Sequence, residues 1–298
     1  MKLLLPLFVL SLSAPLYAQT IPGFSDTPHP IHIYGSAATK AVFAQGFQEP
    51  DGLLLERDGN VLLTDSKAGD VIRLDQTGKR LATLATGLKT PTMLIPNWQG
   101  GVLITERGAN RVVRLQSDGN VWPLGIDITA PVGIVSNSFL SWTVISQSSS
   151  QIYQWEPGMA PGEGEISLQL RHGKWKTLRS ASTTQNEDKR HNFRSIAASG
   201  STLFLSDETG GSVWMASSGG FLSQFATALG RPSGLAFSPD GALYVCDESN
   251  GGRLWELDQQ GKGTIVLHGL GKPSGIVFSD AKNAFIANRD GSVWKISF

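Results

Sequence analysis

The sequence is poor in cysteine and in charged residues, and both shortages restrict what the protein can be. Its 298 residues include one cysteine, Cys246, which excludes an internal disulfide and a cysteine-rich zinc framework. Charged residues make up 17%, below the roughly 25% of an average globular domain. The 25 Lys and Arg balance the 25 Asp and Glu, which argues against a nucleic-acid-binding surface.

Several motifs are also missing. No phosphate loop or dinucleotide fingerprint occurs, so no nucleotide cofactor is expected. No nucleophile-elbow motif brings a Ser, His and Asp together for acyl transfer. The only long apolar run lies at the N-terminus and is about half the roughly 20 residues needed to cross a bilayer, so we expect no membrane span.

That N-terminal run has the organisation of a secretory signal. Met1 and Lys2 precede an apolar stretch over residues 3–12, and small residues follow up to Ala18. We therefore expect a signal peptide over residues 1–18, cleaved after about Ala18, and a periplasmic or secreted protein. The remaining residues, 19–298, are expected to form a single domain.

Glycine is abundant, with 34 residues, and many of the glycines belong to an internal repeat. Copies recur about every 40 residues, with an insertion of about 22 residues in the third copy. The copies begin at Pro50, Pro91, Pro131, Phe193, Pro232 and Pro273.

Each copy predicts four strands. A hairpin with a glycine turn such as Asp58-Gly59 is followed by a third run of alternating apolar residues and a more variable fourth run. Six such copies predict an all-β fold, a six-bladed β-propeller of four-stranded blades. The last copy stops after three strands, so residues 40–47 are expected to supply its outer strand and close the ring. The insertion, at about 156–190 in blade 3, is expected to be an extended outer hairpin with a loop.

In a propeller, the start of each first strand and the end of each second strand meet at one face of the central channel. Carboxylates at these positions would suit a hard cation such as Ca²⁺, which prefers six to eight oxygen ligands. Aspartates that end strands also commonly bond the backbone of their own turn, and this structural interpretation stays open. The expected metal ligands are Asp51, Asp65, Glu106, Asp207 and Asp247.

Other residues at the channel face are candidates for binding a small molecule. Arg194 would orient an anionic substrate or stabilise an oxyanion. His191, in the loop before it, is a candidate to reach the channel mouth as a general base. The remaining candidates for substrate binding are Thr92, Ser233 and Ser274, at the matching positions of three other blades.

Phrases such as Arg231-Pro232-Ser233-Gly234-Leu235, continuing to Asp240-Gly241, resemble the six-bladed propellers of the gluconolactonase and regucalcin type and the NHL repeat. In the lactonases, a Glu, an Asn and an Asp hold a divalent cation, and the Asp serves as base. Pro50-Asp51-Gly52 matches the Pro-Asp-Gly of these lactonases, with Glu49 beside it, whereas Arg194 stands where an Asn or Asp would be needed. The resemblance implies metal-assisted hydrolysis of a lactone or ester with Asp51 as base or ligand. If the protein is an enzyme, the expected catalytic residues are Asp51 and Arg194, with one divalent cation, Ca²⁺ by preference.

Two further propeller families share short sequence features with this protein. Thr105-Glu106 resembles part of the streptogramin lyase site, but Thr92 stands where those enzymes have a histidine. Quinone-dependent sugar dehydrogenases need a channel-lining histidine that is missing here, so no quinone is expected. The competing function class is a non-catalytic NHL-like binding or scaffolding protein of the periplasm, since Ser233 and Ser274 stand where a lactonase would need an Asn or Asp. The expected partner is accordingly a small molecule or a periplasmic protein.

Overall fold

The computed structural model describes residues 38–97, 100–138, 141–147, 151–156, 174–178, 191–217 and 222–298. The expected signal peptide and most of the insertion at 156–190 lie outside these residues. The described part is all-β, and its one helical element is a short 3-10 turn, η1 (Arg107–Ala109). None of its helices is long and apolar enough to cross a membrane.

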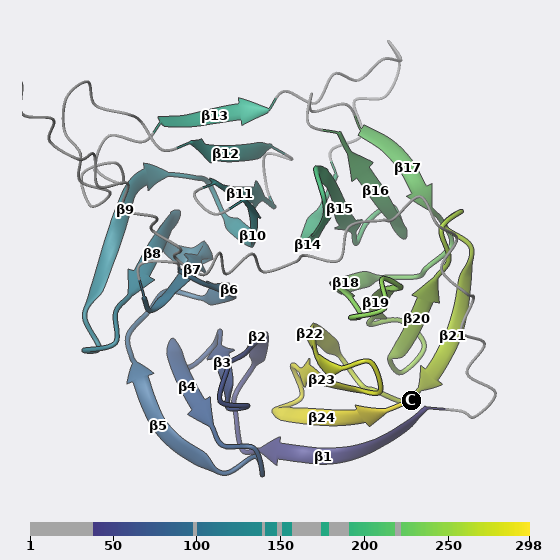
Figure 1. Cartoon of the computed structure of the whole chain (residues 1–298), viewed down its shortest axis with the longest axis horizontal. Helices are drawn as coiled ribbons and strands as arrows, with labels where there is room; N and C mark the ends of the chain where they lie inside the picture. The colour runs from purple at the N-terminus through teal and green to yellow at the C-terminus, as the bar shows by residue number, and fades with distance from the viewer. Residues whose placement is uncertain are drawn as a thin grey trace, which may run out of the picture.

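Six four-stranded antiparallel sheets surround a central channel, which confirms the predicted six-bladed propeller (Figure 1). The innermost strands are β2, β6, β10, β14, β18 and β22. From the channel outward, the blades consist of β2 (Pro50–Leu55), β3 (Val61–Asp65), β4 (Asp70–Leu74) and β5 (Arg80–Ala85); β6 (Pro91–Pro96), β7 (Val102–Glu106), β8 (Arg111–Leu115) and β9 (Val121–Asp127); β10 (Pro131–Ser138), β11 (Ser141–Ser146), β12 (Ile152–Glu156) and β13 (Lys174–Leu178); β14 (Phe193–Ser199), β15 (Thr202–Asp207), β16 (Ser212–Ala216) and β17 (Leu222–Ala226); β18 (Pro232–Phe237), β19 (Leu243–Asp247), β20 (Arg253–Leu257) and β21 (Gly263–His268); and β22 (Pro273–Asp280), β23 (Asn283–Asn288), β24 (Ser292–Ser297) and β1 (Thr39–Gln45).

The ring closes as the sequence predicts. β1 is the outer strand of the sixth blade and pairs antiparallel with β24, so that Lys40 lies opposite Ile296 and Val42 opposite Trp294. Both ends of the described chain therefore contribute to one sheet (Figure 1). The edge of β24, which would otherwise be open, is covered by a strand of the same molecule.

The core is divided among the spaces between blades. Alternate residues of each sheet face the two neighbouring sheets, so every blade contributes to two apolar clusters. Between blades 3 and 4, for example, Ile145 of β11 packs with Phe193 and Ile196 of β14. Six such clusters are described, one for each junction of the ring. Cys246 is fully buried in one of them, as expected for an unreactive thiol, and burial raises its pKa.

The inner strands approach one another very closely around the channel. A Cβ atom on Gly275 would lie 2.2 Å from the backbone oxygen of Asp51, and one on Gly52 would lie 2.3 Å from that of Thr92. Real Cβ atoms do not tolerate such distances, so the glycine of the repeated Pro-X-Gly motif is required for the strands to pack side by side. The residue before each such glycine is placed at the channel.

Candidate functional site at the channel mouth

A repeated backbone bond places two residues of each blade at the channel mouth. The residue after the second strand donates its N–H to the residue before the first strand: Glu248 to Arg231 and Arg289 to Lys272, each over 3.0 Å. Equivalent bonds occur at Ser66, Arg107, Gln147 and Glu208. The residues that follow the second strands are therefore held at fixed places near the channel.

The carboxylates that end the second strands are used for structure. Asp247 is fully buried and accepts from the backbone N–H of Arg231 over 2.9 Å and from Nε of Arg253 over 2.7 Å. It also accepts from Ser249 and from the indole N–H of Trp255. Burial acts to raise the pKa of Asp247, but these hydrogen bonds outweigh it and hold the pKa below its usual value.

The equivalent residues in three other blades behave in the same way. Asp65 accepts from the backbone N–H groups of Gln48 and Glu49 over 2.7 and 3.0 Å. Glu106 accepts from the Lys89 N–H and from Nε of Arg111, each over 2.6 Å. Asp207 accepts from the Asn192 N–H over 3.1 Å and contacts Nδ1 of His191 at 2.8 Å. Burial again acts to raise the pKa of Asp207, and the hydrogen bonds lower it overall.

These four carboxylates and Asp51 do not form the ligand set expected for a divalent cation. A cation needs several oxygen atoms with free lone pairs directed at one point. Asp65, Glu106, Asp207 and Asp247 instead direct their oxygens to N–H groups of their own blades. Among the described residues no three His, Cys, Asp or Glu side chains form a group that could hold a metal. The donor set therefore does not fit Ca²⁺, and the turn-forming interpretation describes these residues better.

Three hydroxyl residues at the first-strand positions are buried and bond the neighbouring blade. Ser233 donates to the carbonyl of Pro273 over 2.6 Å, Ser274 to that of Pro50 over 2.9 Å, and Thr92 to that of Val132 over 3.1 Å. Thr92 and Ser274 also border the channel pocket, whereas Ser233 is not among its lining residues. Their main described contacts join one inner strand to the next.

The pocket at the channel mouth is lined by residues from all six blades and contains about 480 Å³ free of protein atoms, part of it open to solvent. Its charged lining residues are Asp51, Arg107, Arg194 and Arg289. Its apolar lining includes Leu53, Met93, Val132, Leu235 and Ile276. Asp51 and Arg194, the two residues expected to be catalytic, thus face the same pocket.

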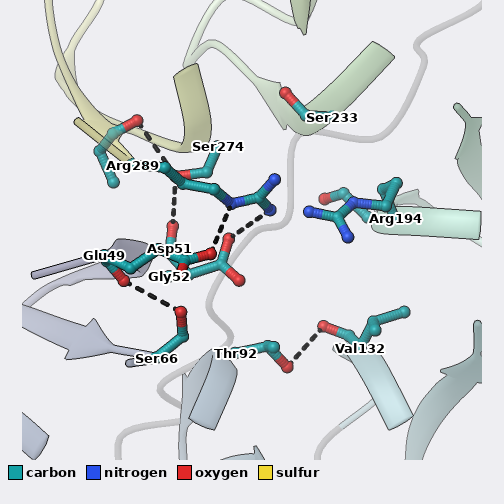
Figure 2. A network of polar contacts seen from close by, with 12 residues as sticks. Glu49, Asp51, Gly52, Ser66, Thr92, Val132, Arg194, Ser233, Ser274 and Arg289 are labelled. Carbon is teal, nitrogen blue, oxygen red and sulfur yellow. Dashed lines mark hydrogen bonds and ion pairs between the residues drawn. The ribbon is translucent and has the colours of Figure 1, made fainter. Parts of the chain in front are cut away.

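Arg289 is surrounded by carboxylates. Its Nη2 donates to Oδ1 of Asp51 over 3.0 Å, and its Nη1 donates to Oε1 of Glu248 over 2.5 Å. Oε1 of Glu49 lies 3.9 Å from its Nε. Figure 2 shows Arg289 beside Asp51, with its guanidinium group pointing toward that of Arg194.

Arg194 and Arg107 have fewer negatively charged partners than Arg289. Nε of Arg194 lies 3.7 Å from Oε2 of Glu208, whose Oε1 is bonded to Arg231. Nη1 of Arg107 donates to the amide oxygen of Gln147 over 3.3 Å. No hydrogen bond of the Nη groups of Arg194 to any described residue is found, and in Figure 2 these groups point into the channel.

His191 contacts Asp207, the carboxylate that ends β15, instead of the pocket. Its Nδ1 lies 2.8 Å from Asp207, its ring stacks on Phe193 with centroids 5.0 Å apart, and the edge of Trp214 packs against it. His191 is not among the pocket-lining residues. These contacts describe a packed histidine that helps to anchor the start of blade 4.

Four charged residues of the channel mouth were not identified from the sequence: Arg107, Glu208, Glu248 and Arg289. Arg107, Glu208 and Glu248 each come directly after a residue selected from the sequence, and Arg289 stands at the same position of blade 6, after Asn288. Side chains alternate along a strand, so Glu248 points away from the hydrogen bonds that Asp247 makes within its own blade. The signal that could have found them is this alternation, counted one residue further.

Glu248 has an unusual environment. Its side chain is 9% exposed, and its pKa is raised to about 7. Burial is the main cause, and the charges of Glu208 and Asp51 also raise the pKa, while those of Arg231 and Lys272 lower it. Glu248 is therefore a carboxyl group that is costly to ionise in its place at the channel mouth.

Comparison with known proteins supports the fold. Residues 229–257 match the model of the NHL repeat. Among solved structures, a virginiamycin B lyase from Staphylococcus aureus is 16% identical with a TM-score of 0.60, covering 88% of this chain and 99% of that one. A gluconolactonase from Xanthomonas campestris is 16% identical with a TM-score of 0.64, covering 93% and 96%. A comparison with curated protein sequences finds no match.

A third similar structure is described as an auxiliary nutrient binding protein from Bacteroides thetaiotaomicron. It is 13% identical with a TM-score of 0.68, covering 87% of this chain and 76% of that one. The expected resemblance to NHL-repeat and gluconolactonase-like propellers is therefore confirmed. At these identities, the likeness extends to the fold and not to the activity.

Proposed function

We propose that this protein is an exported six-bladed propeller that binds a small polar molecule through an anionic group at the channel mouth. The observation that supports it best is the pair Arg107 and Arg194, which line one pocket and have few described anionic partners. Guanidinium groups favour carboxylates and phosphates because their planar fork can donate two parallel hydrogen bonds. Export is supported by the signal-like residues 1–18.

At the described positions of the channel mouth, blade 3 places no charged side chain between these arginines. Val132 of β10 stands at the position that Asp51 and Arg194 occupy in their own blades, and it carries no charge. Gln147, after β11, offers an amide in place of a charged group. An anion between Arg107 and Arg194 would therefore meet no carboxylate from blade 3.

Binding, and not metal-assisted hydrolysis, is the function that this geometry supports. Asp51 was the expected base, but its Oδ1 is held by Arg289, and the carboxylates expected beside it bond their own blades. The arrangement is suited to holding a ligand in a preformed pocket. We therefore favour the non-catalytic binding class considered from the sequence.

The test is a ligand screen followed by calorimetry. Mature protein would be melted with a panel of small carboxylates, sugar acids, amino acids, inorganic phosphate and matched uncharged amides, and each stabilising compound titrated calorimetrically. Arg194→Gln should weaken binding of an anionic hit at least about tenfold, because one charge-assisted hydrogen-bonded pair is lost. Arg194→Lys should keep part of the affinity.

The matched control is Arg73→Gln. Arg73 pairs with Glu56 at 2.7 Å in blade 1 and does not line the pocket. Its substitution should leave ligand affinity unchanged. Hits that bind Arg194→Gln as tightly as the native protein, or a panel with no hit, would overturn the proposed site.

A further inference from the structure

The charges at the channel mouth are separated into two halves. The half built from blades 5, 6 and 1 places three carboxylates, Glu49, Asp51 and Glu248, around the guanidinium of Arg289, and a second guanidinium, that of Arg231, lies 3.8 Å from Glu248. One of these carboxylates lines the pocket itself: Asp51, whose Oδ1 bonds Arg289. No described residue hydrogen-bonds its Oδ2. This half therefore carries an excess of negative charge and an available acceptor.

The opposite half carries an excess of positive charge. Arg107 and Arg194 face the pocket from blades 2 and 4. The carboxylate nearest to Arg194, that of Glu208, is bonded to Arg231. Opposed charges across one small pocket fit a ligand whose own charges are separated in the same direction.

We propose that the ligand of the channel mouth is a small zwitterion, with its carboxylate at Arg107 and Arg194 and its ammonium group at Asp51. This inference rests on the proposed anion site and adds the second charge. An ammonium group donates up to three hydrogen bonds, and Oδ2 of Asp51 can accept one of them. The cation would also offset the repulsion among Glu49, Asp51 and Glu248.

The pocket walls restrict the class of zwitterion further. Leu53, Met93, Leu235 and Ile276 give apolar surface beside the charged groups. A free amino acid or a short peptide with an aliphatic side chain combines both charges with an apolar group. The charged ends of a longer polymer would lie too far apart to reach Asp51 and the two arginines within one pocket.

Glu248 lies close enough to this half of the pocket to respond to a bound cation. Burial and the like charges of Glu208 and Asp51 raise its pKa to about 7, against the opposite charges of Arg231, Lys272 and Arg289. A bound ammonium group would favour the charged form of Glu248. Binding of a zwitterion near neutral pH should therefore release protons.

The test compares ligands that differ by one charge. Leucine, leucyl-glycine, glycyl-leucine and 6-aminohexanoic acid would be titrated calorimetrically at pH 7.5, beside N-acetyl-leucine, which lacks the ammonium group, and leucinamide, which lacks the carboxylate. At least one zwitterion should bind, and its partners with one charge removed should bind at least about tenfold more weakly. Comparison of leucine with the two dipeptides also shows which distance between the ammonium and carboxylate groups fits the site.

Two variants separate the halves of the site. Asp51→Asn should lower the affinity for the zwitterion about tenfold and leave that for N-acetyl-leucine unchanged, whereas Arg194→Gln should weaken both. Asp290→Asn, at an acidic residue on the same face that is 48% exposed, is the matched control and should change neither. Circular dichroism melting of each variant would verify that it folds.

The outcomes distinguish the two proposals. If N-acetyl-leucine or other pure anions bind as well as the zwitterions, and Arg194→Gln weakens them, then the anion site stands and the zwitterion inference is overturned. If leucinamide binds best and Arg194→Gln has no effect, both are overturned. Absence of binding in every arm also overturns the zwitterion inference.

Discussion

Nη2 of Arg289 donates to Oδ1 of Asp51 over 3.0 Å, and this contact joins the last blade of the ring to the first. The same guanidinium holds Glu248 of the fifth blade. One side chain therefore ties three blades together at the channel mouth. Arg289 therefore both holds these blades together and lines the candidate binding pocket.

Replacing Arg289 should destabilise the protein strongly. Arg289→Ala leaves Asp51 and Glu248 partly buried without their cation, so we expect a loss of about 3 kcal/mol in the free energy of unfolding. Arg231→Ala removes an arginine that is 57% exposed and should cost less than about 1 kcal/mol. Urea unfolding at pH 8 would measure both losses. Equal losses would contradict the role of Arg289 in joining the three blades.

Removing Asp247, the buried carboxylate that ends the second strand of blade 5, should also destabilise the fold. Asp247→Ala abolishes a buried ion pair with Arg253 and the hydrogen bond from the Arg231 N–H, with an expected loss of about 3 kcal/mol. Asp258→Ala is the control, because Asp258 accepts from two backbone N–H groups in an exposed turn and should cost about 1 kcal/mol. If Asp247→Ala unfolds no more easily than Asp258→Ala, the contacts of Asp247 do not stabilise the fold.

Glu248 should make the protein less stable as the pH rises through neutrality. Its pKa of about 7 in the folded state lies above its unfolded value, so its contribution is fully present below about pH 4.5 and is lost as the pH passes 7. Because the site is partly open to solvent, we expect a loss of about 1 kcal/mol between pH 5 and pH 8. Urea unfolding of native protein and Glu248→Gln would show this loss in the native protein alone.

A matched variant completes that experiment. Glu56→Gln removes a carboxylate that pairs with Arg73 outside the pocket and should keep the pH slope of the native protein. A Glu248→Gln variant that follows the native slope between pH 5 and pH 8 would place the titrating group elsewhere.

Divalent cations should not stabilise the described fold. A site occupied at about 100 times its dissociation constant would add about 2.7 kcal/mol, a shift of several degrees in melting temperature. Since the described carboxylates form no group suited to a metal, we expect the melting temperature in EDTA and in millimolar Ca²⁺, Mg²⁺, Mn²⁺ or Zn²⁺ to agree within about 1 °C. A rise with one specific cation would restore the metal-assisted mechanism.

The fold was predictable because the repeat appears in several ways at once. Alternating strands recur in every copy, and a turn glycine and a Pro-X-Gly motif each occur in four of the six; each limits the backbone locally. The role of residues 40–47 in closing the ring followed from counting strands, and β1 confirms it.

The site was harder to predict because a shift of one residue along a strand reverses the direction of its side chain. Asp51 and Arg194, both selected from the sequence, line the pocket. Asp247 was grouped with them, but its hydrogen bonds lie within its own blade. Arg289 was missed since its three carboxylate partners come from two other blades.

The pairing of β1 with β24 also orders events during synthesis. Lys40 is synthesised long before its partner Ile296, so the sixth blade cannot be completed until β24 has been made. Until then β1 is a strand without a neighbour, which is a site for mispairing. A chain that stopped before β24 would therefore leave β1 unpaired.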